Sequence, residues 1–107
     1  GESMKNYFDN HYPRRLKDLK EELDKISVPA YGRELDDDQI RQKITEFVKV
    51  INRFADNTKL HITNLSSADP KYLNKYLNMI MPKYLLDYFG EETPTGKMFK
   101  TLYKSKF

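Results

Sequence analysis

The sequence predicts an all-α fold: a small single-domain bundle of four to five helices, with one helix kinked or broken at Pro82. Three observations support this class. The chain has 107 residues, a length that fits one small domain. Eight Tyr and six Phe residues supply the aromatic side chains that a packed core needs and that disordered chains lack. Apolar residues recur at helical spacing in four segments separated by Pro and Gly, and no segment is a convincing strand.

The first predicted helix spans about 13–27, with Pro13 in the first turn, where the N–H that proline lacks is not needed. Its apolar residues alternate steps of three and four, as in two heptads of a coiled coil. They are Leu16, Leu19, Leu23 and Ile26. Two interpretations stay open: a narrow stripe that packs on the domain, and a seam for self-association. The aromatic segment 6–12 is either an extra turn or an arm that packs back.

The second predicted helix spans about 37–56 and follows a loop at about 28–35. Asp36 suits the N-cap, and Gln39 three residues later completes a capping box. A broad apolar face makes this helix central to the core. The face consists of Ile40, Ile44, Phe47, Val48, Ile51, Phe54 and Ala55. The segment 59–65 fits neither period, and we expect a short helical turn or an extended connector there.

The third predicted helix is capped by Asp69, has Pro70 in its first position and ends at Gly90. At about 100° per residue, one apolar face runs through Pro82 without losing phase, and we predict that it is core. It contains Leu73, Leu77, Ile80, Met81, Tyr84, Leu85 and Tyr88. Pro82 falls on the far side, where a kink or break follows from the backbone hydrogen bond that proline removes.

A second apolar line lies roughly opposite this face. It contains Tyr72, Met79, Leu86 and Phe89, and it is rimmed by Lys75 and Lys83. A surface helix needs only one apolar face, so a helix with two is either sandwiched or presents one to a partner. Coverage by the first and last helices, docking of another protein and a small-ligand pocket all stay open.

The basic charge is concentrated near the C-terminus, at about 95–107. The net charge is +3, yet 97–107 holds four of the 19 basic residues and none of the 16 acidic ones, so the rest of the chain is close to neutral. This segment contains Met98, Phe99 and Leu102 at helical spacing, which would cap the core. A non-sequence-specific contact with nucleic-acid phosphates is the alternative function, through Lys97, Lys100, Tyr103, Lys104 and Lys106.

No residue pattern indicates an enzyme, a metal site or a cofactor. The chain has no Cys, which excludes disulfides and thiolate chemistry. The acidic run 36–38 is typical of a helix N-terminus and lacks the alternation of a calcium loop. His11 and His61 stand alone, with no metal-ligand spacing and no adjacent nucleophile. The four glycines form no phosphate-binding loop.

We therefore predict a non-catalytic protein–protein interaction domain, of an adaptor or regulatory kind, that binds another protein through the second apolar line. No apolar run is long enough to span a membrane, and an intracellular location, cytoplasmic or nuclear, is expected. Residues 1–3, which precede Met4, look like a cloning remnant, and 4–107 is interpreted as a single domain.

Overall fold

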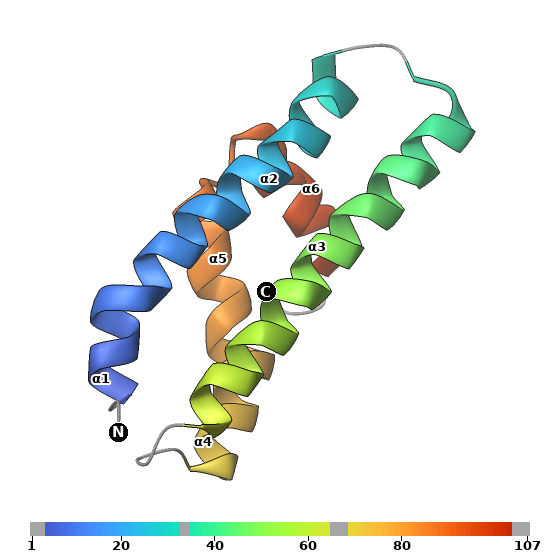
Figure 1. Cartoon of the computed structure of the whole chain (residues 1–107). Coiled ribbons are helices and arrows are strands. Elements are labelled where there is room, and N and C mark those ends of the chain that lie inside the picture. The colour runs from blue at the N-terminus through green and yellow to red at the C-terminus, as the bar shows by residue number, and fades with distance from the viewer. Residues whose placement is uncertain (1–3, 33–34, 65–68, 104–107) are drawn as a thin grey trace.

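The computed structural model describes residues 4–32, 35–64 and 69–103, and over these ranges it confirms the all-α bundle (Figure 1). Four helical rods make up the described chain. The first is α1 (Met4–Asn6), the π-helical turn η1 (Tyr7–His11) and α2 (Tyr12–Gly32); the second is α3 (Asp37–Thr63); the third is α4 (Pro70–Lys75), the π-helical turn η2 (Tyr76–Ile80) and α5 (Met81–Phe89); the fourth is α6 (Pro94–Tyr103).

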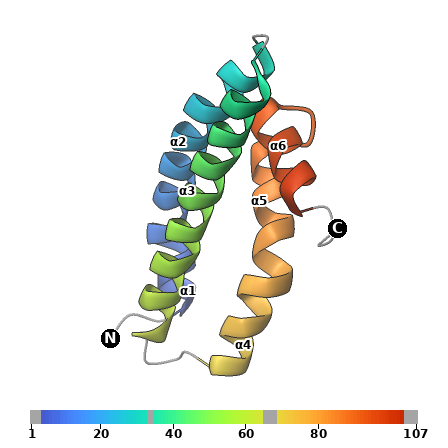
Figure 2. The same ribbon diagram turned by 90° about the vertical axis from the view of Figure 1, so that its right-hand side faces the viewer.

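The bundle is elongated, with principal extents of 49 × 25 × 22 Å. Helices α2 and α3 form a long antiparallel hairpin, and the rod α4–η2–α5 runs along one side of it (Figure 2). The short helix α6 folds back beside α5 and also packs on α2. The core therefore lies between the hairpin on one side and α5 with α6 on the other.

The three-four stripe of α2 is buried by this chain. Leu16, Leu19, Leu23 and Ile26 are each less than 10% exposed. The packed-stripe interpretation is confirmed, and self-association through these side chains is not supported because helices α3 and α6 already cover them.

Helix α3 begins as predicted, with a complete capping box. The Gln39 N–H donates to Asp36 Oδ1 at 2.8 Å, and the Asp36 N–H donates to Gln39 Oε1 at 3.1 Å. Phe47, Ile51 and Phe54 are buried, as their spacing indicates. Ile40, in the first turn of α3, is instead 41% exposed. The helix continues to Thr63, so the ambiguous segment is helical as far as that residue.

The first rod does not begin at Pro13. It is helical from Met4, and the turn η1 lets it pass through the proline. The Tyr12 N–H donates to the Tyr7 carbonyl, which closes a turn one residue longer than an α-turn. In an α-helix the ring of Pro13 would collide with the carbonyl of Asp9, four residues earlier. The longer turn opens the space that the ring needs.

The third rod also accommodates a proline through a π-turn. The Met81 N–H donates to the Tyr76 carbonyl and closes η2 immediately before Pro82. The helix is therefore not broken there. In both rods the sequence reads Tyr, five further residues, then Pro: YFDNHYP at 7–13 and YLNMIMP at 76–82.

A π-turn contains one extra residue, so it rotates everything that follows it relative to an ideal α-helix. The core face predicted for the third rod is consequently only partly right beyond 77, where Met81 and Leu85 are buried as predicted. Ile80, Tyr84 and Tyr88 are exposed, between 37% and 48%. The buried side chains beyond that point are Met81, Pro82, Leu85, Leu86 and Phe89. Leu73 is buried as predicted, and Leu77 is half-buried against the core.

A tight turn sets the position of α6. Gly90 has a φ of +86°, a backbone conformation that residues other than glycine rarely adopt. A Cβ added to Gly96 would stand 1.8 Å from the Gly90 carbonyl oxygen, so the two backbones meet here. The hydroxyl of Thr93 donates to the Phe89 and Gly90 carbonyls and accepts the Gly96 N–H at 3.0 Å. The predicted core contacts of Met98 and Phe99 are confirmed by their burial.

Candidate interaction surface

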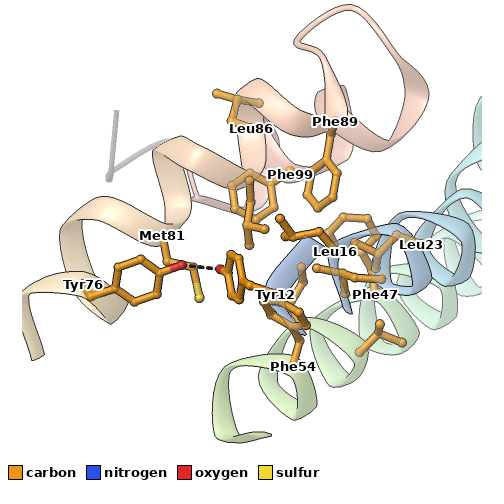
Figure 3. Close-up of a cluster of buried hydrophobic side chains, with 14 of the residues drawn as sticks. Tyr12, Leu16, Leu23, Phe47, Phe54, Tyr76, Met81, Leu86, Phe89 and Phe99 are labelled. Atoms are coloured by element: carbon orange, nitrogen blue, oxygen red, sulfur yellow. Dashed lines mark hydrogen bonds between the residues drawn. The ribbon is translucent and has the colours of Figure 1, made fainter. Parts of the chain in front are cut away.

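The rod α4–η2–α5 has one side fixed in the core. Leu86 is 5% exposed and Phe89 is 2% exposed, and the Phe89 ring packs edge-on against Phe99 of α6 at 5.6 Å between centroids (Figure 3). These two residues were predicted to bind a partner, and the structure contradicts that assignment. Phe99 of α6 packs on Phe89, and the low exposure of both Leu86 and Phe89 means that this chain itself covers them.

The opposite side of the rod is open. The other predicted partner-binding residues, Tyr72, Lys75, Met79 and Lys83, are all exposed. Met79 is the most exposed apolar side chain of the rod, at 62%. This part of the predicted surface is accessible, although its continuation along α5 is not through Leu86 and Phe89.

Sequence reasoning did not select the apolar side chains that are exposed along α5. Ile80, Tyr84 and Tyr88 follow one another at four-residue steps, which places them along one ridge of α5. Together with Tyr72 and Met79 they form what we call the outer stripe. The signal that could have located it is the shared pattern of Tyr, five residues and Pro, because it marks the extra residue that moves the ridge outward.

The outer stripe is anchored by a buried aromatic cluster where the two π-turns meet. The Tyr76 hydroxyl donates to the Tyr12 hydroxyl, and this bond joins the first and third rods (Figure 3). Tyr84 of the stripe lies 6.1 Å from Tyr12, and Tyr72 stacks on Tyr76 at 6.4 Å between centroids. Burial raises the pKa of both Tyr12 and Tyr76 well above its ordinary value, so both hydroxyls are neutral at physiological pH.

The polar residues next to this cluster complete the core and join α2 to α3. The Arg15 guanidinium donates to the Tyr7 hydroxyl at 2.5 Å, and to Thr58 Oγ1 and the Phe54 carbonyl, each at 3.3 Å. It also lies 4.8 Å from the centre of the Phe54 ring. Every buried side-chain nitrogen and oxygen in the described ranges has a hydrogen-bond partner. The charge of Arg15 is thereby used to join α2 to α3.

The two histidines, which are distant in sequence, both pack against the ring of Tyr7. The ring of Tyr7 stacks with His61 at 5.5 Å and with His11 at 6.1 Å between centroids. Their role here is packing around a buried tyrosine. No group of three or more His, Cys, Asp or Glu side chains within 4–32, 35–64 and 69–103 could hold a metal ion.

The alternative, nucleic-acid surface lies on α6 and beyond it. Lys97 and Lys100 are exposed, and Tyr103 is half-buried, with a pKa raised by that burial. Lys104 and Lys106 lie outside the described residues. The contact with phosphates stays a prediction, and it rests on two described lysines and a tyrosine that is partly engaged in the core.

The described surface has hollows of different sizes. One of about 300 Å³ lies between α3 and α4 beside Leu73, and one of about 330 Å³ lies between α2 and α3 beside Ile26. One of about 150 Å³ lies between α2 and α3 and is lined by residues of both charge signs, among them Arg15, Glu22 and Arg53. Pockets for small organic ligands measure roughly 300–1,000 Å³ and are mostly apolar. The hollow of about 150 Å³ is smaller and is lined about equally by polar and apolar surface, and the Glu22–Arg53 ion pair at 3.7 Å joins its two walls. The other two hollows have volumes at the lower end of that range.

Comparisons with protein-family models, curated proteins and solved structures found no match to this chain. Within the described part of the chain, the helices are all too short or too polar to cross a membrane. Inferences about function therefore rest on the geometry and chemistry of the surface itself.

Proposed function

We propose that this chain is a non-catalytic protein-interaction domain that binds its partner through the outer stripe. The observation that carries the proposal is the row of exposed apolar side chains Met79, Ile80, Tyr84 and Tyr88 on a helix whose opposite side is fully packed. Single exposed apolar residues need no explanation, but a contiguous row on one helix marks a contact site.

The composition of the stripe suits protein recognition. Tyr and Met are enriched at the centres of protein–protein interfaces, because Tyr offers a large rigid surface with a polar end and Met adapts its shape. Lys75 and Lys83 lie beside the stripe and supply a polar rim. A partner helix laid along the rod would contact side chains at three- and four-residue steps.

Site-specific photo-crosslinking tests this proposal. A benzophenone amino acid replaces Met79 in one variant and the exposed Asn52 of α3 in another, and both are irradiated in cells that express the chain. We expect a discrete covalent adduct from position 79 that is absent from position 52. The adduct's mass identifies the partner, including a second copy of this chain.

The captured protein is then purified and titrated against the wild type and two variants. Wild type and Asn52→Asp are expected to bind it equally, whereas Met79→Asp is expected to lose at least about tenfold in affinity because it places a charge inside an apolar contact. Far-ultraviolet circular dichroism verifies that the Met79 variant remains folded. Equal binding by the wild type and both variants, or no adduct specific to position 79, would refute the proposal.

A further inference from the structure

Charged residues on α5 are arranged in a way that the outer stripe alone does not require. Lys83 directly precedes Tyr84 and Asp87 directly precedes Tyr88, so both charges follow the same flank of the stripe. Both side chains are exposed, and among the described residues no ion pair joins them, although their four-residue spacing permits one.

This order of charges is complementary to itself when the helix is reversed. In an antiparallel pair related by a two-fold axis perpendicular to both helices, each flank faces the same flank of the other copy. Lys83 then lies opposite Asp87 of the second copy, and the converse contact forms at the same time. The axis passes close to Tyr84, which faces its own equivalent, while Ile80 faces Tyr88 of the second copy.

We propose that the occupant of the outer stripe is a second copy of this chain, paired antiparallel along α5. This inference rests on the proposed function, since it assigns a partner to the same surface. Two-fold pairing through one shared patch is the commonest form of protein oligomer, because each favourable contact occurs twice.

The charges at the two ends of the stripe agree with this orientation. Lys75 is exposed on the N-terminal half of the rod, and Glu91 and Glu92 are exposed just beyond its C-terminal end. Antiparallel pairing brings the basic half of each copy toward the acidic end of the other. Parallel pairing would instead set like charges side by side, which is unfavourable.

The dimensions of the rod are compatible with a stable contact. Twenty residues from Pro70 to Phe89 give a helix about 30 Å long at 1.5 Å per residue. A row of Met, Ile and Tyr side chains along this length, facing its own copy, supplies the apolar centre that obligate helical interfaces have. The lysines and carboxylates on the flank then select the antiparallel register.

Sedimentation equilibrium of the full chain, with charge-reversal variants, tests the pairing. We expect the wild type to be dimeric. Lys83→Asp should weaken self-association by at least about tenfold, because both flank contacts become pairs of carboxylates, and Asp87→Lys should do the same with pairs of lysines. The matched control is Lys49→Asp, at an exposed position of α3, which should leave the dimer unchanged. Circular dichroism checks that each variant keeps its helical content.

A double variant and a mixture of two single variants make the test specific for the antiparallel register. The double variant Lys83→Asp/Asp87→Lys restores both contacts and should dimerise like the wild type. An equimolar mixture of Lys83→Asp and Asp87→Lys should form a heterodimer, since each copy supplies the charge that the other lacks. A dimer of undiminished strength in both single variants would overturn the proposed pairing.

A monomeric wild type up to about 1 mM, on the scale of weak complexes, would also overturn this inference. That result leaves the proposed function standing if the Met79 crosslinker captures a different protein. The proposed function fails separately if no adduct of either kind forms at position 79. The masses of the adducts therefore distinguish the two failures.

Discussion

The turns η1 and η2 are built alike, yet they have different consequences for the molecule. Each begins with a tyrosine, contains one residue more than an α-turn and is followed by X-Pro. Only three described residues precede the turn η1, so its extra residue changes the phase only of the short segment that precedes α2. The turn η2 lies in the middle of its rod and determines which side of α5 enters the core.

The difference teaches that the effect of a π-turn depends on how much helix lies on each side of it. Beyond η1, the buried residues of α2 keep the spacing that the sequence predicts. Beyond η2, the same reasoning is only partly right. It assigns Ile80, Tyr84 and Tyr88 to the core in place of Leu86 and Phe89, although Leu85 is buried as predicted. Four predictions test this comparison, in order of decreasing effect.

Deletion of single residues should have the largest effect. Removing Asn78, together with Pro82→Ala, takes out the extra residue of η2 and leaves the α5 core face in place as a continuous α-helix. Removing Lys83 instead rotates Leu85 and Phe89 out of the core, at about 2–5 kcal/mol for each large side chain. That loss is comparable with a typical domain stability of about 5–15 kcal/mol.

Thermal melts followed by circular dichroism should therefore show a folded Asn78 deletion and an unfolded Lys83 deletion. The equivalent change in η1, deletion of Asn10 with Pro13→Ala, should also fold, because it only realigns Tyr7 with the stripe of α2. Equal melting of the Asn78 and Lys83 deletions would contradict the role given to η2.

Substitution of two neighbouring aromatic residues tests directly which face of α5 is buried. Phe89→Ala should lower the free energy of unfolding by about 3–5 kcal/mol, because the ring is buried against Phe99. Tyr88→Ala should lower it by less than about 1 kcal/mol, since the ring is 39% exposed. Urea denaturation of the two variants measures both changes in the free energy of unfolding. The reverse order would place Tyr88 in the core, as the uninterrupted helical wheel predicts.

The hydroxyl contact between the two rods should have an intermediate effect. Tyr12→Phe or Tyr76→Phe alone leaves one buried hydroxyl without a partner, at a cost of about 1–3 kcal/mol. The double variant removes both hydroxyls and should cost clearly less than the sum of the single changes. A double-mutant cycle by urea denaturation measures this coupling, and strict additivity would show that the hydroxyls do not interact.

Alkaline pH should produce the smallest of these effects. The folded pKa values of Tyr12 and Tyr76 are raised by burial from 10.0, so below about pH 10 both tyrosines stay protonated, whether the chain is folded or unfolded. Above pH 10 the unfolded chain releases these protons and the folded chain does not, so stability falls as pH rises.

The loss should amount to about 1 kcal/mol for each of the two tyrosines at pH 11. Denaturation curves at pH 8 and pH 11 for the wild type and the Tyr12→Phe/Tyr76→Phe variant measure the difference. An identical pH dependence in both proteins would mean that these hydroxyls titrate normally in the folded state.

The sequence predicted the fold class and much of its detail where the cause is local. The capping box at Asp36, the cap at Asp69 before Pro70, and the buried stripe of α2 all follow from residues within one or two turns of each other. For the candidate surface, sequence patterning selected side chains that are exposed in the N-terminal half of the third rod, Tyr72 and Met79. It misplaced the C-terminal half, because a helical wheel assumes that no residue is inserted.

The amino-acid sequence by itself determined where the second and third rods begin and which rods carry apolar faces, since caps, prolines and periodic burial act over short distances along the chain. Only the tertiary structure decided which face of α5 is core. Pro82 disfavours a regular helix but does not specify how the helix adapts. The choice of a π-turn is fixed by what it brings together across the bundle: the hydroxyls of Tyr12 and Tyr76, and the ring of Phe89 against Phe99.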